Sequence, residues 1–162
     1  MSLRFLRMNM EIDMKLGFLA VAVLVGVSAL GDRAHAEMLI SKQEAALPAA
    51  AATGLTFRGV TRGPKVEMVS PAASAGAVQS PVDLKMKFQS FGGATIDPNS
   101  VKVTYLKNPV VDLTPRVKKY IQSGGLDMSA AEMPEGDHPI RVDIKDSEGR
   151  AGTATFTLKV TK

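Results

Sequence analysis

The clearest pattern along the chain is a strict alternation of apolar and polar residues in VDLKMKF, residues 82–88. Val82, Leu84, Met86 and Phe88 occupy one phase of this alternation, and aspartate and lysine residues occupy the other. Successive side chains of a β-strand point to opposite faces of the sheet, so one face of this segment is apolar and the other is polar. The pattern predicts a half-buried antiparallel strand.

Other stretches show the same two-residue period and are bounded by residues typical of turns. Two of them flank DSEGR, residues 146–150, and together predict a β-hairpin near the C-terminus. Besides residues 82–88, the predicted strands are residues 65–69, 100–106, 125–128, 138–144 and 154–160, of which the last two form this hairpin. Six or seven short strands over about 100 residues are typical of an all-β domain, a β-sandwich of two sheets around one core. A closed barrel is the main alternative.

One segment, DLTPRVKKYIQSGG in residues 112–125, does not alternate. Thr114 is a good helix N-cap, and Pro115 suits the first helical position. Three apolar residues that follow share one helical face, and Gly124-Gly125 is a typical helix end. The segment predicts a short helix that crosses between strands.

The N-terminal 36 residues have the features of a secretory signal peptide. Lys15 precedes an apolar run, residues 16–30, which is too short to span a bilayer, where about 20 residues are needed. Ala34-His35-Ala36 then supplies the small-residue pattern that a signal peptidase recognises. We expect cleavage after Ala36, and a retained membrane anchor is the alternative.

Residues 37–63 contain SKQEAALPAAAATG, whose few apolar residues follow no sustained period. We interpret them as a flexible Ala/Pro-containing tether ahead of a folded domain at residues 64–162. An alternative is a short helix through Ser41–Ala46, because Ser41 and Glu44 have the spacing of a capping box.

Composition narrows the cell compartment and the classes of partner. The chain has no cysteine, which excludes disulfides, thiolate chemistry and a lipidated cysteine. Without the leader's four basic and three acidic residues, 16 basic and 13 acidic residues remain, for a net charge of +3. This small charge, with no basic stripe or stacking aromatics, argues against nucleic acid as a partner. We expect a bacterial periplasmic or secreted protein, with no membrane span after signal cleavage.

Residues 64–162 resemble the bacterial immunoglobulin-like domains of exported proteins. The resemblance rests on Ser80-Pro81 before VDLKMKF, on the turn IDPNSV leading into VTY, and on MPEGDHPIRVDIKDSEGR followed by TFTLKV. It implies an Ig-like β-sandwich of about seven strands, and members of the family mostly serve as spacers, adhesion modules or carbohydrate-binding accessories. The chain differs from the pattern in having a single domain and a helix where the middle strands usually lie.

Metal binding and catalysis have little support in the sequence. A metal site needs three or four converging ligands, and the chain has two histidines, His35 and His138. The chain also has a weaker likeness to copper-binding β-barrels of the copper-resistance type. Those proteins bind copper through histidines, and this chain has too few of them. The acids Asp143, Asp146 and Glu148 lack calcium-loop spacing and suit turn geometry. His138 falls on the inward phase of its strand, which predicts a structural corner residue, and no nucleophile motif accompanies it.

The remaining candidate surface is a local concentration of basic residues, Lys107, Arg116, Lys118 and Lys119, for which an ordinary solvated face is the alternative interpretation. A carbohydrate platform would need exposed aromatics, but the chain has no Trp, and after residue 36 only Phe57 and Phe91 fall outside inward phases. We therefore expect a non-enzymatic, cofactor-free module that contacts a protein partner at the cell envelope or serves as a scaffold. The alternatives are a small-ligand or metal carrier and a carbohydrate-binding accessory module; the sequence does not define the oligomeric state.

Overall fold

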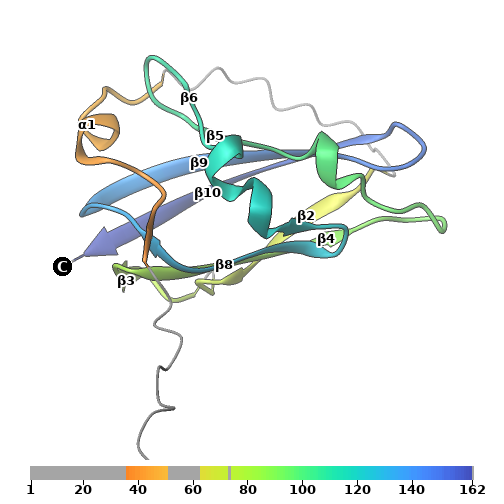
Figure 1. Cartoon of the computed structure of the whole chain (residues 1–162), viewed down its shortest axis with the longest axis horizontal. Helices are drawn as coiled ribbons and strands as arrows, with labels where there is room; N and C mark the ends of the chain where they lie inside the picture. The colour runs from red at the N-terminus through yellow and green to blue at the C-terminus, as the bar shows by residue number, and fades with distance from the viewer. Residues whose placement is uncertain (1–35, 51–62, 73, 162) are drawn as a thin grey trace, which may run out of the picture. The chain divides into compact units, whose positions relative to one another are not determined.

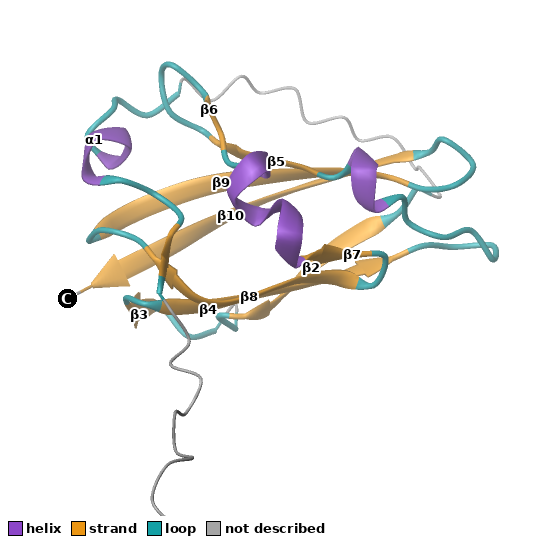
Figure 2. Ribbon diagram, viewed as in Figure 1, coloured by secondary structure: helices purple, strands orange, loops and turns teal. Residues whose placement is uncertain are grey.

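The computed structural model describes residues 36–50, 63–72 and 74–161. These residues form two five-stranded sheets that lie one above the other, as Figures 1 and 2 show. The expected signal peptide, residues 1–36, lies outside the described residues except for Ala36. None of the helices formed in these ranges has the length and apolar character needed to cross a membrane.

The first sheet has the strand order β1-β8-β4-β2, and β7 also pairs with β8. Its strands are β1 (Glu37–Met38), β2 (Lys65–Ser70), β4 (Val82–Gln89), β7 (Ile121–Gln122) and β8 (Gly125–Glu132). The second sheet has the order β3-β10-β9-β5-β6. Its strands are β3 (Ala77–Gln79), β5 (Lys102–Tyr105), β6 (Val111–Asp112), β9 (Gly136–Lys145) and β10 (Ala151–Thr161).

The alternating segments form strands as predicted, and their apolar phases face the core. In β4, Val82, Leu84, Met86 and Phe88 are all buried. The C-terminal hairpin of β9 and β10 is antiparallel, with register from Ala151 opposite Lys145 to Val160 opposite Gly136. The core between the sheets includes Val103, Tyr105, Leu126, Met128, Ile140, Val142 and Ile144. The sandwich-like, all-β prediction is confirmed at this level.

The predicted helix exists but is shorter and capped differently. Helix α2 (Thr114–Val117) is followed by the 3₁₀ turn η2 (Lys118–Tyr120), and the chain enters β7 directly afterwards. Leu113 occupies the N-cap position, and the Thr114 hydroxyl accepts a hydrogen bond from the Val103 amide of β5 at 3.0 Å. The prediction of a helix that continues to Gly124-Gly125 is therefore wrong.

The two glycines belong to the β7–β8 hairpin instead. Ser123 and Gly124 form its turn. Gly125 has a φ of +158°, and a Cβ atom at this position would collide with the Met86 carbonyl of β4. Only glycine allows the two backbones to approach so closely.

Residues 37–50 are not the flexible tether that the sequence suggested. They form β1 and helix α1 (Lys42–Ala45), and Leu39 and Ile40 are buried in the core. The alternative interpretation, a short helix begun by Ser41 with Glu44, is confirmed by a complete capping box. Residues 51–62 of the expected tether lie outside the described residues. We call residues 37–50 the N-terminal clamp.

Candidate functional site

The N-terminal clamp begins as a parallel strand on the edge of β8. Glu37 lies opposite Ala131 and Met38 opposite Glu132, and the Leu39 amide donates to the Glu132 carbonyl at 2.9 Å. Leu39 is fully buried and Ile40 is 2% exposed. Burial of each of these two side chains contributes roughly 1.5–3 kcal/mol, which offsets part of the entropy lost when the segment is ordered.

The clamp then turns into helix α1 through its capping box. The Glu44 amide donates to the Ser41 hydroxyl at 3.3 Å, and the Ser41 amide donates to the Glu44 carboxylate at 2.9 Å. Each bond satisfies a backbone or side-chain group that would otherwise be unpaired at the helix start. The box therefore fixes the position of the Glu44 carboxylate.

Arg116 of α2 binds this carboxylate in a bidentate arrangement. Its guanidinium reaches the two Glu44 oxygens at 2.6 and 2.9 Å and also donates to the Leu39 carbonyl at 2.7 Å. The Arg116 hydrogen bond is the main reason that the pKa of Glu44 falls to about 2, although partial burial opposes it. The same bond raises the pKa of Arg116. One side chain thus joins α2 both to α1 and to the residue that follows β1.

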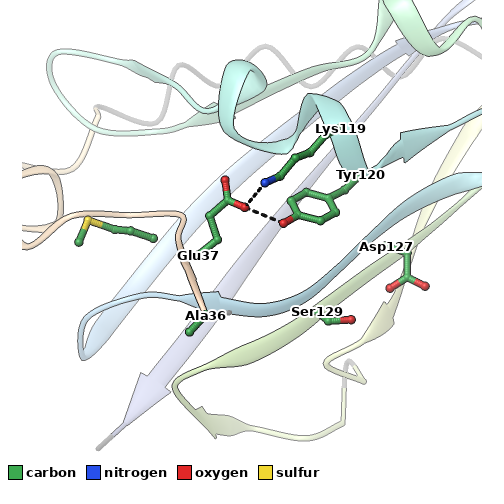
Figure 3. A pocket seen from close by; sticks show the side chains of 7 residues that line it. Ala36, Glu37, Lys119, Tyr120, Asp127 and Ser129 are labelled. Atoms are coloured by element: carbon green, nitrogen blue, oxygen red, sulfur yellow. Dashed lines mark hydrogen bonds and ion pairs between the residues drawn. The ribbon is translucent and has the colours of Figure 1, made fainter. Parts of the chain in front are cut away.

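Glu37 is held by two side chains of η2 (Figure 3). The Lys119 ammonium and the Tyr120 hydroxyl each lie 2.6 Å from the same Glu37 carboxylate oxygen. The hydrogen bond from Lys119, followed by that from Tyr120, lowers the pKa of Glu37. The carboxylate is consequently charged at neutral pH.

The four basic residues proposed from the sequence divide into two groups. Arg116, Lys119 and Lys107 all contact the N-terminal clamp; the Lys107 ammonium donates to the Ala45 carbonyl at 3.1 Å. Lys118 is exposed on η2. Binding of a partner by these residues stays a prediction, and for three of them the structure shows an internal contact that local sequence patterns did not indicate.

Beside the clamp, part of the β8 edge has no strand partner. On this edge β7 pairs with Gly125 and Leu126, and β1 pairs with Ala131 and Glu132. Among the described residues no strand pairs with the stretch between them, residues 127–130, on this side. We call this stretch the edge gap.

A shallow hollow of about 520 Å³ lies at the edge gap. It is lined by Ala36, Glu37, Met38, Lys119, Tyr120, Asp127 and Ser129. Figure 3 shows Ser129 and Asp127 of β8 on one side and the Glu37, Lys119 and Tyr120 group on the other. Sequence reasoning did not find this site, because it depends on where two short neighbouring strands stop.

His138 is buried, in agreement with its inward phase. Its side chain is 1% exposed; Nδ1 lies 2.9 Å from the Tyr105 hydroxyl, and Nε2 lies 2.8 Å from the Pro134 carbonyl. A carbonyl only accepts, so Nε2 carries the proton and Nδ1 accepts from the hydroxyl. Burial lowers the pKa of His138 and raises that of Tyr105 to about 12, which keeps both groups neutral.

The acids of the C-terminal hairpin are used by the loop itself. Asp146 is 4% exposed and accepts from the Glu148 and Arg150 amides and the Arg150 guanidinium at 2.7–3.0 Å. Burial would raise the pKa of Asp146, but these donors outweigh it and the net shift is downward. Asp143 instead pairs with Arg141. Within the ranges that the structure describes, no three His, Asp or Glu side chains are grouped to hold a metal ion.

No protein-family model, curated protein or solved structure matches this chain.

Proposed function

We propose that this protein is an exported, non-catalytic module with an immunoglobulin-like sandwich, and that it acts by contacting another protein at the cell envelope. The observation that carries the proposal is the edge gap, an interrupted sheet edge next to an open hollow. The leader pattern in residues 16–36 supports export.

The arrangement of the first strands supports an immunoglobulin-like sandwich. β2 pairs with β4 in one sheet, and β3, which follows it closely in sequence, pairs in parallel with the end of β10 in the other sheet. These two neighbouring strands in different sheets, and the C-terminal hairpin of β9 and β10 in the second sheet, are compatible with the two-sheet sandwich that the sequence resemblance implies. A sandwich fold alone does not define a function, so the proposed function rests on the edge gap.

Strand addition is the mode of contact that the edge gap favours. Backbone amides and carbonyls of a strand point alternately to its two edges, so those of residues 127–130 that face away from β4 can pair with an extended peptide. The adjoining Met38 side chain is 58% exposed and offers an apolar contact. A partner would therefore present a short extended segment opposite residues 127–129, since Ala130 has a φ of +55° and its amide already donates to the Asp83 carboxylate at 3.0 Å.

A non-catalytic role is favoured by the state of the polar groups. His138, the one histidine after residue 36, has both ring nitrogens occupied and lies in the core. Of the charged groups at the hollow, Glu37 and Lys119 pair with each other, and Asp127 pairs with Lys85.

Site-directed photo-crosslinking in producing cells tests the contact. A photoreactive residue at Ser129, inside the edge gap, should give a discrete adduct with one partner. The matched control is the same residue at Thr155, which is also an exposed strand position but lies on β10 of the other sheet. Identical adducts at both positions, or none at Ser129, would contradict contact at the edge gap.

A second experiment separates the edge gap from the basic helix. Lys118→Glu changes the charge of η2 without touching the clamp, whereas reversal of Arg116 or Lys119 would also detach residues 37–45. If the Ser129 adduct persists in the Lys118→Glu variant, the helix surface is not required. Loss of the adduct in that variant would support the basic residues instead.

A further inference from the structure

We propose that the folded domain shelters its own leader-processing site, so that cleavage of the Ala36–Glu37 bond has to precede docking of the N-terminal clamp. The proposal goes beyond the contact with a partner, and it rests on the exported leader that is part of the proposed function; the photo-crosslinking result at Ser129 does not bear on it. It rests on the position of the expected cleavage site immediately before β1.

The residue on the far side of this bond is fixed in three ways. Glu37 pairs with Ala131 in the sheet, and its carboxylate accepts from Tyr120 and Lys119 at 2.6 Å each. Ala36, on the near side of the bond, is exposed. The obstacle to a peptidase therefore lies on the domain side of the bond.

The residues that follow Glu37 are held still more firmly. Leu39 and Ile40 are buried in the core, and the Leu39 carbonyl accepts from Arg116. Glu44, further along, forms the bidentate pair with the same guanidinium. Residues 37–40 cannot leave β8 without exposing two apolar side chains and breaking these contacts.

Hydrolysis of the Ala36–Glu37 bond requires residues 37–40 to separate from β8. A peptidase binds an extended chain on both sides of the bond; water then adds to the Ala36 carbonyl, the C–N bond breaks, and an Ala36 carboxylate and a Glu37 ammonium are formed. Proteolysis of a folded protein proceeds through the locally open state, at a rate proportional to its population when reclosing is fast. Each contact that holds the clamp therefore slows cleavage of a folded precursor.

The test uses the full chain, residues 1–162, in detergent micelles with a purified bacterial signal peptidase. The chain is presented either directly on dilution from urea or after folding is complete. We expect cleavage after Ala36, confirmed by N-terminal sequencing of the product, and a rate at least about tenfold lower for the folded chain.

Variants on the receiving side of the clamp leave the cleavage sequence unchanged. Arg116→Ala should speed cleavage of the folded chain by about tenfold or more, and Tyr120→Phe, which removes one hydroxyl, by roughly two- to tenfold. The matched control is Lys118→Ala, an exposed neighbour, which should cleave at the wild-type rate. All variants should be cut equally fast when unfolded.

Three results would overturn the proposal. One is equal cleavage of the folded and unfolded wild-type chains. Another is cleavage of the unfolded chain at a different bond or not at all. The third is a wild-type cleavage rate for the folded Tyr120→Phe variant. This substitution is conservative, so it still provides a test if the Arg116→Ala variant does not fold.

Discussion

His138 lies on the inner face of β9 with hydrogen bonds at both ring nitrogens. Protonation would place a second N–H at Nδ1, opposite a Tyr105 hydroxyl that now donates to it, inside the core. Burial is the largest cause of the lowered His138 pKa, and the Pro134 hydrogen bond opposes it. At the scale of one residue, the polar pair is stable because both partners stay neutral.

This lowered pKa makes stability depend on pH. In an unfolded chain the His138 pKa is about 6.5, so the unfolded state takes up a proton before the folded state does. The contribution of His138 to the free energy of unfolding is therefore complete above about pH 6.5. It decreases as the pH falls towards the pKa of His138 in the folded state. In a chain of residues 37–162, the free energy of unfolding should fall from pH 7 to pH 5, as measured by urea titration.

His138→Phe is the control for this prediction. It should lower stability at pH 7, because the Tyr105 hydroxyl and the Pro134 carbonyl lose a partner, but its curve should be flatter between pH 7 and pH 5. The carboxylates with lowered pKa, such as Glu44 at about 2, lose their charge only at lower pH. Parallel curves for the two proteins would show that His138 is not the group that titrates.

The N-terminal clamp shows how much one short element depends on tertiary contacts. A helix of four residues, such as α1, has no stability of its own in water. It forms because Leu39 and Ile40 fix the preceding chain in the core and Arg116 binds Glu44. At the element scale, packing of adjacent segments determines this structure more than local propensity does.

Leu39→Ala measures the packing contribution of the clamp. A fully buried leucine shortened to alanine costs about 2–5 kcal/mol, and we expect a loss in this range from urea unfolding of residues 37–162. Met38→Ala is the matched control: its neighbouring side chain is 58% exposed and should change stability by no more than about 0.5 kcal/mol. Equal effects of the two substitutions would mean that the clamp does not pack as described.

The alternating segments could be predicted from sequence because one face of each is buried, as in β4 and β9. The N-terminal clamp could not be predicted in this way, because its buried residues Leu39 and Ile40 are adjacent and do not alternate with polar residues. Arg116 and Glu44 are 72 positions apart, so local patterns carry no sign of their pairing. Only the capping box of Ser41 and Glu44 left a local signal. The edge gap has none, since it is defined by the ends of β1 and β7.

In the folded domain as a whole, the clamp connects the two sheets. It starts on β8 of the first sheet and ends beside the chain that leaves β5 of the second. There the Ala50 amide donates to the Leu106 carbonyl at 3.2 Å, and the Asn108 amide donates to the Pro48 carbonyl at 2.9 Å. A segment bonded to both sheets adds to the stability of the sandwich itself.

A chain that begins at Pro64 should therefore be much less stable than one that begins at Glu37. Burial of Leu39 and Ile40 contributes roughly 3–6 kcal/mol before the entropy of ordering the segment is subtracted, and a typical domain is stable by only about 5–15 kcal/mol. Urea unfolding followed by circular dichroism should show a clearly lower midpoint for the shorter chain. Coincident midpoints would mean that the clamp contributes nothing to the sandwich.

The start of β1 at Glu37 also bears on the design of recombinant versions of the protein. Ala36 lines the hollow beside the edge gap, so an affinity tag or fluorescent fusion joined ahead of Glu37 would emerge into the surface under study. A label joined beyond Thr161 leaves from β10, a strand of the opposite sheet. Purification handles therefore belong at the carboxyl end.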